Sequence, residues 1–412
     1  IQLEMAAFRF LIDARGDELR KKQIISSVLQ IVSIIFTLCL TALFVVSCFF
    51  DFKYINLIVL NIGIAMFLNL FLQFARGFGE NKKFAVASII SGISMAVGAL
   101  TLIAILKLGA QGMLISIAFA NLVSLVYLFF SLKLYRYISL RDGDAGIKKD
   151  LIKYSAPLIP NGVSWWVISV SDRTIVSIFA GVAANGIYAV ANKYAAIFSS
   201  IFAIFSMSWT ESVSVHIDAK DRDRFLSDTT NASVKLFGSL GLFLIAFIPL
   251  VFSILVSKEF NEAYLYIPIL VIAAFFNMMV GLYSAIYIAK KLTRQVASTS
   301  IVAAVINIVI NLVLIRYIGI YAAAISTLAA YLIMTIYRHH DVKKYVKITY
   351  DRYIFISLGI VCLPVVYLYY LNNLLGNLLN MLLVIMVIMV LNKTMISVVK
   401  NKVLSADYSI KK

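Results

Sequence analysis

Long apolar segments recur through most of this 412-residue chain. A helix needs about 20 residues to cross a bilayer, and hydrophobic residues make up 62% of the chain against 14% charged ones, which excludes an ordinary soluble domain. The sequence therefore predicts an all-α polytopic membrane protein, with residues 1–12 as the end of a further helix. Twelve segments are long enough to span: 24–48, 54–75, 84–106, 111–132, 152–180, 187–210, 231–256, 264–289, 296–316, 319–337, 352–371 and 375–398.

The loops between these segments differ sharply in basic residues. One alternating set holds 30 Lys and Arg residues, whereas the other holds only Lys53, Lys107, Lys258 and Arg316. By the positive-inside rule the basic set is cytoplasmic, and so is the C-terminus. The net charge of +17 thus reflects membrane orientation and does not indicate nucleic-acid binding.

The two halves of the chain resemble each other in the same orientation. Residues 12–15 read IDAR and residues 217–220 read IDAK, and Gly109 and Gly319 follow corresponding spans. Such parallel repeats predict two pseudo-symmetric lobes with substrate between them. The partners of spans 152–180 and 187–210 would then precede residue 1, so we expect two helices to be absent from this chain.

Residues 154–211 are predicted to form two spans joined by a tight turn at residues 181–186. They carry three ionisable residues, Asp172, Arg173 and Lys193. Asp172 and Lys193 would lie roughly 15 Å from the turn, near the middle of the hydrocarbon layer. Because a charge there costs about 2.5–3.5 kcal/mol on insertion scales, these side chains are expected to face protein or a wet cavity, and they mark a candidate functional site.

Several motifs between residues 154 and 325 resemble one transporter family. They are YSAPLIP (154–160), SWW (164–166), SDR (171–173), GIYAVANK (186–193), AAVINIVINLVLI (303–315) and GIYAAAI (319–325). The chain resembles the polysaccharide transporter family of O-antigen-type oligosaccharide-lipid flippases, within the multidrug/oligosaccharidyl-lipid/polysaccharide exporter superfamily.

The resemblance implies two six-helix lobes and two further C-terminal helices. The domains would be an N-terminal lobe at 1–135, a cytoplasmic linker at 136–150, a C-terminal lobe at 151–337 and the extra helices with a cytoplasmic tail at 338–412. Members move isoprenoid-diphosphate-linked oligosaccharides across the cytoplasmic membrane of a bacterium or archaeon for capsule, O-antigen or exopolysaccharide assembly. Partners would include membrane lipids, a polymerase and glycosyltransferases, but no nucleic acid.

The resemblance implies transport without covalent chemistry, so no catalytic residue is expected. The sequence shows no phosphate-binding glycine loop of the nucleotide-hydrolase kind. We therefore expect no cofactor, with energy coming from polymerisation or from a coupling ion, H⁺ or Na⁺. The cysteines and histidines show no metal-ligand spacing.

Three charges are the leading site candidates. Arg173 is the first for the diphosphate, because a guanidinium contacts phosphate oxygens in pairs, and Lys193 is the second. Asp172 is a counter-ion to Lys193 or a proton or cation site. The alternative is a buried Asp172–Lys193 pair that joins two helices, with Arg173 extending outward.

Further candidates rest on chemistry and position. Arg9 either faces the cleft or anchors its helix at the interface. Trp165 and Trp166 lie near mid-depth, where packing competes with stacking on a sugar ring. Tyr188 and Tyr194 are cavity candidates. Asn307 and Asn311, four residues apart, either hydrogen-bond across helices or line the cavity.

Other functions remain open at this point. A multidrug or organic-cation antiporter of the same superfamily predicts an acidic, aromatic cavity, whereas Asp172, Arg173 and Lys193 sum to +1. A membrane-embedded glycosyltransferase or polymerase predicts a large outer loop, yet the outer loops here are short. A flippase for the peptidoglycan precursor shares the diphosphate chemistry.

Overall fold

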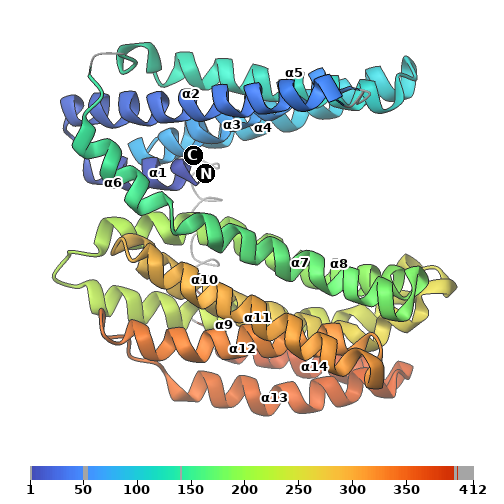
Figure 1. Ribbon diagram of the computed structural model, residues 1–412. Helices are drawn as coiled ribbons and strands as arrows, with labels where there is room; N and C mark the ends of the chain where they lie inside the picture. The colour runs from blue at the N-terminus through green and yellow to red at the C-terminus, as the bar shows by residue number, and fades with distance from the viewer. Residues whose placement is uncertain (1, 50–53, 140–141, 394–396, 398–412) are drawn as a thin grey trace, which may run out of the picture. The chain divides into compact units, whose positions relative to one another are not determined.

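The chain folds into helices throughout. The computed structural model describes residues 2–49, 54–139, 142–393 and 397, and all regular elements in these ranges are helical. Two compact units divide the chain, unit 1 (Ile1–Ile159) and unit 2 (Pro160–Lys412), and each is a helical bundle (Figure 1). The end of the predicted span 375–398 and the predicted cytoplasmic tail lie outside the described residues.

Unit 1 is built from long helices and two short ones. Gly79 ends one of the long helices with a φ of +82°, a conformation that glycine adopts without strain. Asp144 caps the last helix by accepting a hydrogen bond from the backbone N–H of Ile147 at 2.7 Å. The elements are α1 (Leu3–Asp13), α2 (Glu18–Phe49), α3 (Ile55–Phe78), α4 (Asn81–Ala99) continuing as the π-helix η1 (Leu100–Ile105), α5 (Gly109–Ser131), the 3₁₀ turn η2 (Leu134–Arg136) and α6 (Ala145–Ser155).

Unit 2 contains the remaining helices. The first of them, α7, begins two residues before the boundary of the unit. The elements are α7 (Leu158–Ala180), α8 (Val182–His216), α9 (Arg222–Leu255), the 3₁₀ segment η3 (Lys258–Tyr266), α10 (Ile267–Ala289), α11 (Thr293–Ile318), α12 (Tyr321–Val342), α13 (Arg352–Leu371) and α14 (Leu374–Leu391).

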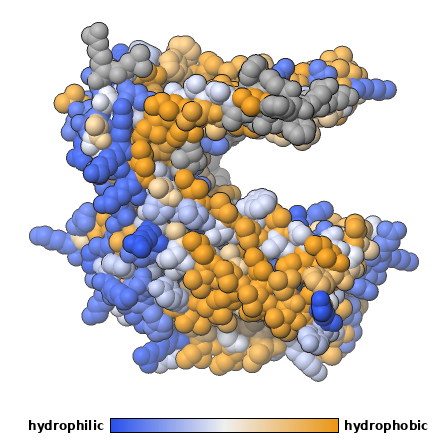
Figure 2. All heavy atoms as spheres, viewed as in Figure 1, coloured by the Kyte–Doolittle hydropathy of each residue, from blue (hydrophilic) through white to orange (hydrophobic). Residues whose placement is uncertain are grey.

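Within the described residues, ten helices are long and apolar enough to cross a membrane. This count agrees with the prediction of a polytopic membrane protein. The two other predicted spans are helical as α7 and α12, but polar side chains such as Asp172, Arg173 and Arg338 lower their mean hydropathy. In unit 2, apolar residues gather around the middle of the helices and hydrophilic ones lie toward the ends (Figure 2).

The two units use the same pairs of helices. In unit 1, α1 packs against α3, α3 against α5 and α4 against α5, whereas in unit 2 the pairs are α8 with α10, α10 with α12 and α11 with α12. Helices α3, α4 and α5 begin at Ile55, Asn81 and Gly109, and α10, α11 and α12 each begin 212 residues later. The packing therefore follows the internal repeat of the sequence.

Two predicted boundaries differ from the structure. The predicted span 152–180 is divided, because α6 ends at Ser155 and α7 starts at Leu158 after Pro157, which has no N–H to continue a helix. The predicted turn at 181–186 is reduced to Gly181 with a φ of +92°, so α8 begins at Val182. Measured from Gly181, Asp172 and Lys193 lie about 14 Å and about 18 Å along their helices.

The C-terminal helices are fixed to unit 2 by polar contacts. Tyr264 and Tyr369 each donate a hydrogen bond to the other's backbone carbonyl at 2.7 Å, and their rings stack with centroids 4.1 Å apart. The amide of Asn392 donates to Ser239 Oγ of α9 at 2.8 Å. These contacts attach α13 and the end of α14 to η3 and α9.

Candidate functional site

Asp172 lies at the centre of a polar network inside unit 2. The residue is 3% exposed and comes from the middle of α7. Its carboxylate accepts hydrogen bonds from Tyr188 Oη of α8 at 3.1 Å, from Asn311 Nδ2 of α11 at 2.9 Å and from Thr327 Oγ1 of α12 at 2.5 Å. All three donors are neutral, so one charge joins four helices without a cationic partner among the described residues.

Asn307 extends this network by one helical turn. Its amide donates to Ser326 Oγ and Thr327 Oγ1, each at 3.3 Å, and its carbonyl accepts from Ser171 Oγ at 3.2 Å. Asn307 and Asn311 are both fully buried, and their hydrogen bonds to α7 and α12 are the predicted bonds across helices. The Oδ1 of Asn311 has no hydrogen-bond partner among the described residues, which leaves an acceptor beside the carboxylate.

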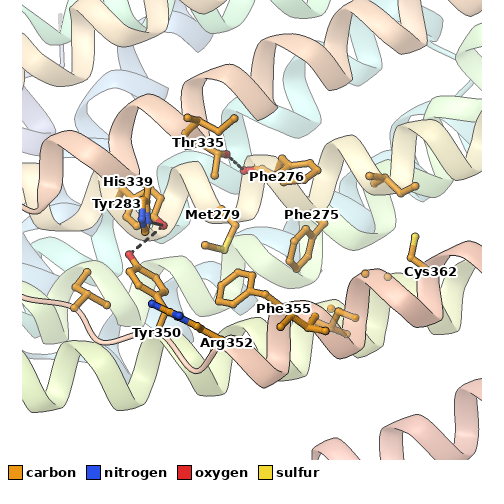
Figure 3. Close-up of a pocket in the computed structure, with 18 of the residues that line it drawn as sticks. Phe275, Phe276, Met279, Tyr283, Thr335, His339, Tyr350, Arg352, Phe355 and Cys362 are labelled. Atoms are coloured by element: carbon orange, nitrogen blue, oxygen red, sulfur yellow. Dashed lines mark hydrogen bonds between the residues drawn. The ribbon is translucent and has the colours of Figure 1, made fainter.

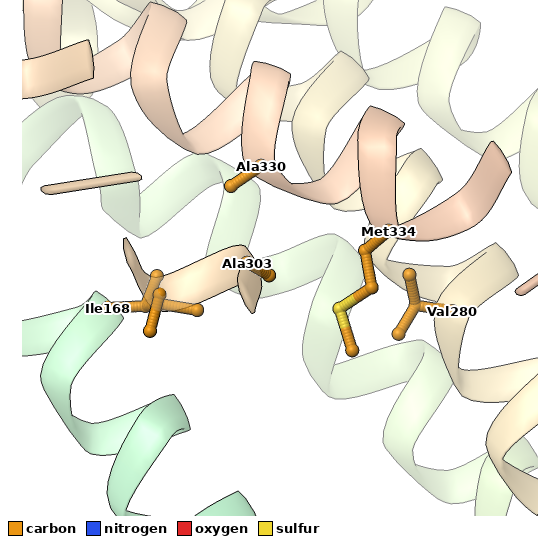
Figure 4. Close-up of a cluster of buried hydrophobic side chains, with 6 residues drawn as sticks. Ile168, Val280, Ala303, Ala330 and Met334 are labelled. Atoms are coloured by element: carbon orange, nitrogen blue, oxygen red, sulfur yellow. The ribbon is translucent and has the colours of Figure 1, made fainter. Parts of the chain in front are cut away.

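An apolar layer lies next to the network along the same helices. It consists of six buried residues: Ile168, Val280, Ala303, Ala304, Ala330 and Met334 (Figure 4). Ile168 precedes Asp172 by one turn of α7, and Ala303 precedes Asn307 by one turn of α11. Apolar side chains therefore separate the network from the rest of the bundle on this side.

Arg338 lies beyond the apolar layer, one turn after Met334 on α12. Its guanidinium is fully buried and donates to Thr299 Oγ1 at 2.7 and 3.0 Å, to the carbonyls of Val280 and Val296 at 3.1 and 3.2 Å, and to Ser284 Oγ. The predicted span 319–337 ends just before Arg338, which therefore counted among the 30 basic residues of the cytoplasmic loops. The structure corrects this, because the residue lies inside α12 and ties it to α10 and α11.

Arg173 is exposed on unit 2, in contrast to its neighbour. Consecutive helix residues point about 100° apart, so the burial of Asp172 turns Arg173 onto another face of α7. This face borders a hollow of about 430 Å³. Its lining is Ser169, Val170, Arg173, Thr174, Ser177 and Ile178 of α7 with Asn185 of α8.

Lys193 does not pair with Asp172, contrary to the expected buried pair. Tyr188 is the residue of α8 that reaches the carboxylate, and Lys193, five residues later, points about 140° away around the helix. Lys193 is exposed, and none of the ion pairs within the part of the chain that the structure describes includes it. The alternative of a pair that joins α7 to α8 is therefore wrong, although Asp172 does join them through Tyr188.

The remaining candidates are not among the residues that line the hollow. Arg9, in unit 1, is buried and forms an ion pair with Asp13 one turn later. Trp165 packs against Tyr331 with ring centroids 5.7 Å apart, whereas Trp166 is 64% exposed. Tyr194 is buried against Phe252.

Sequence reasoning missed two members of the network, Thr327 and Ser326. Both follow the GIYAAAI motif directly, and a search for hydroxyl residues in predicted spans would have found them. Arg338 had no such signal, because a basic residue at the end of a predicted span reads as a loop residue.

A family model decides the classification of the chain. The model for polysaccharide biosynthesis proteins matches residues 1–210. The chain belongs to the polysaccharide biosynthesis protein family. This confirms the resemblance drawn from the motifs, and no match is found among curated protein sequences.

Solved structures show which fold this polysaccharide biosynthesis protein has. It is similar to a MATE transporter in the bent conformation, with a TM-score of 0.72, 15% identity and 84% of each chain covered. A multidrug resistance MATE family transporter of the MOP superfamily in the outward-facing conformation gives a TM-score of 0.70, 14% identity and 84% coverage of each chain. A MOP superfamily transporter from Pyrococcus furiosus gives 0.68 and 14%, covering 83% of this chain and 84% of that one.

The fold and the family agree with the predicted class. The polysaccharide biosynthesis protein is a multi-pass membrane protein with a MATE-like fold, linked to polysaccharide biosynthesis. The solved structures that share this fold are those of transporters.

Proposed function

We propose that this protein is a flippase that moves isoprenoid-diphosphate-linked oligosaccharides across the cytoplasmic membrane. The supporting observation is the polar, basic face of α7, where Ser169, Arg173, Thr174 and Ser177 border the hollow beside Asn185. Residues exposed to lipid should be apolar, as they are on α14, where Leu378, Leu382, Met386 and Val390 are exposed. The face of α7 therefore suits water or a polar cargo.

The chemistry of the cargo fits such a face. A diphosphate and its sugars lose their hydration in hydrocarbon, which is prohibitive for a charged group. Arg173 supplies paired donors to phosphate oxygens, and the hydroxyl of Ser177 supplies a further donor. The hydroxyl of Thr174 already donates to the carbonyl of Val170 at 2.9 Å. Lys193, exposed on α8, adds a second positive charge, and Trp166, exposed on α7, offers a surface for a sugar ring.

A cation antiporter is the second candidate, because several similar structures are MATE transporters. For the transporter from Pyrococcus furiosus, a reversed polarity of the binding pocket suggests a different function. In this chain the acidic residue of α7 is buried and the exposed charges of α7 and α8 are basic. This polarity favours an anionic cargo over an organic cation.

The Asp172 network is proposed as the site of the coupling ion. A buried carboxylate with only neutral donors needs a positive partner, and either a proton or a small hard cation supplies it. The unpartnered Oδ1 of Asn311 adds an oxygen ligand beside it. Asn185 lines the hollow one turn before Tyr188, so the hollow and the network share helix α8.

The finer architecture belongs to this proposal. The matched helix pairs and the 212-residue offset support two pseudo-symmetric lobes related by an internal repeat. The basic loops support a cytoplasmic C-terminus. The domain limits, the bacterial or archaeal membrane, and the polymerase and glycosyltransferase partners remain predictions.

The test is Arg173→Ala in the complete protein, expressed in cells that lack their own flippase. Hydrogen bonds to a charged group contribute about 1.5–3 kcal/mol, so we expect surface polysaccharide to fall at least about tenfold. Arg173→Lys should restore part of the loss, because it keeps the charge but not the paired donors. Membrane levels of each variant are measured by immunoblot.

Arg294→Ala is the matched control, because Arg294 is an exposed basic residue at the start of α11. It should leave polymer unchanged. Normal polymer from Arg173→Ala would remove this residue from the cargo site. If Arg173→Ala stops peptidoglycan synthesis instead of capsule or O-antigen synthesis, the cargo would be the peptidoglycan precursor.

A further inference from the structure

A second cavity lies in unit 2 between α9, α10, α12 and α13. Its volume is about 1000 Å³, at the upper end of the roughly 300–1,000 Å³ usual for ligand pockets. None of its lining residues borders the hollow at Arg173, and neither α7 nor α8 contributes to it. It is a separate site.

One end of the cavity is a long apolar surface. Figure 3 shows Phe275, Phe276 and Met279 of α10 opposite Phe355 and Cys362 of α13. The hydroxyl of Thr335 is already bonded to the carbonyl of Phe276 at 3.0 Å, so it adds no free polar group. This end suits a hydrocarbon chain.

The other end is polar and basic. Tyr350 donates to Tyr283 at 3.1 Å, and Tyr283 lies 3.3 Å from Nδ1 of His339. In Figure 3 these three side chains gather with Arg352 at the opposite end from Cys362. Lys343, His340 and Lys347 complete the lining at this end.

The nearby carboxylates are already engaged. Asp341 binds Lys344 at 2.8 Å, and Asp351 caps α13 by accepting from the N–H of Tyr353 at 3.1 Å. Asp223 pairs with Arg222 at 2.8 Å and faces Lys347. Lys343 and Arg352 are exposed, and within the described residues neither forms an ion pair. Their charges are therefore available to an anion.

We propose that this cavity holds one anionic glycerophospholipid. Its phosphate would lie at Lys343 and Arg352, its glycerol and ester oxygens near Tyr350 and Tyr283, and an acyl chain along Phe275, Phe355 and Cys362. By the orientation that the basic loops predict, the basic end lies in the cytoplasmic leaflet, where anionic lipids attract such side chains. The inference does not depend on the cargo, because the cavity shares no residue with the proposed cargo site.

The test uses the complete purified protein in a neutral detergent, with native mass spectrometry to count bound lipid. The probes are phosphatidylglycerol and phosphatidylcholine with matched acyl chains. We expect one phosphatidylglycerol to be retained in preference to phosphatidylcholine. Lys343→Ala with Arg352→Ala should weaken its binding about twenty-fivefold, because each basic side chain near an anionic lipid contributes about fivefold.

A second variant fills the apolar end. Gly359 lines the cavity, and a Cβ there meets no atom within 4 Å, so Gly359→Leu enters the groove without a clash and with a better helix former. It should also reduce phosphatidylglycerol binding at least tenfold. The matched control is Lys149→Ala with Lys153→Ala, two exposed basic residues of α6 in unit 1, which should bind lipid as the parent does.

Three results would overturn the assignment. Equal retention of phosphatidylcholine would show a site without headgroup selection. Unchanged phosphatidylglycerol binding in both cavity variants would place the lipid elsewhere. Displacement of phosphatidylglycerol by polyprenyl diphosphate, lost in the same variants, would assign the cavity to the cargo instead.

Discussion

At the scale of single residues, Asp172 combines a charge with a setting that does not neutralise it. Tyr188, Asn311 and Thr327 orient the carboxylate but carry no positive charge. A buried carboxylate is costly unless a positive partner joins it. The proton or small cation that we propose for this site would stabilise the arrangement of the four helices.

Asp172→Asn tests this role with a side chain of the same shape. The amide is neutral and needs no cation, so transport should lose its dependence on the ion gradient and fall at least about tenfold, while the protein stays folded. Transport is measured in cells with and without a sodium or proton gradient, and folding by the thermal midpoint of the purified protein. A variant with the parent's ion dependence would exclude Asp172.

Asp341→Asn is the control for this change. Asp341 is also buried on α12, but it bonds Tyr287 and Lys344 at 2.8 Å and lies outside the network. We expect its replacement to leave the ion dependence unchanged. A similar response in both variants would indicate a general effect of removing buried charge.

The sequence predicted part of this site. The four-residue spacing of Asn307 and Asn311 predicted that they share one face of α11. The prediction that the charges of the span are buried in protein was correct for Asp172. The partner of Asp172 was not predictable, because apparent depth says nothing of rotation around the helix axis. Lys193 lies at a depth in the membrane similar to that of Asp172, but its side chain points to another side of α8. Thr327, which does contact Asp172, comes from a segment 155 residues away.

At the scale of helices, Gly77 lets α1 approach α3 closely. A Cβ at this position would lie 2.7 Å from Leu11 Cβ and 3.4 Å from the carbonyl oxygen of Phe8. Contact between α1 and α3 therefore depends on the missing side chain.

Gly77→Val should force these helices apart. Overpacking a close contact costs about 1–3 kcal/mol, so we expect a lower thermal midpoint in detergent and less protein in the membrane. Gly92→Val on α4 is the matched control, because a Cβ there meets nothing within 4 Å. Equal stability of the two variants would contradict the close packing.

The helices themselves followed from the apolar segments, since each predicted span corresponds to helical structure among the described residues, with the span 152–180 divided between α6 and α7. The boundaries failed at local features. Pro157 divides one predicted span, and Gly181 alone makes the turn that was predicted to occupy six residues. Neither effect follows from hydropathy, which averages over a window and overlooks single backbone conformations.

At the scale of the whole molecule, the basic loops predict the orientation. The measurement is a set of reporter fusions to the complete protein: green fluorescent protein at the C-terminus, and alkaline phosphatase in the loop at Val256–Ser257. Fluorescence and phosphatase activity should both appear, because the first folds inside the cell and the second is active outside it. The inverse pattern would reverse the assigned orientation.

The class of protein could be predicted from the sequence because it depends on properties summed over many residues. Hydropathy gave a polytopic membrane protein, and degenerate motifs gave the family. The cavity at Arg352 was not readable, because its lining comes from four helices and a connection spread over residues 238–362.

The reciprocal hydrogen bonds of Tyr264 and Tyr369, with the contact of Asn392 to Ser239, fasten the last helices to their neighbours at both ends. If unit 2 rocks during a transport cycle, α13 would move together with α9 and η3 as one rigid body. A phospholipid lodged between α9 and α13 would then be lifted or lowered with the moving body, and the surrounding leaflet would have to deform to follow it.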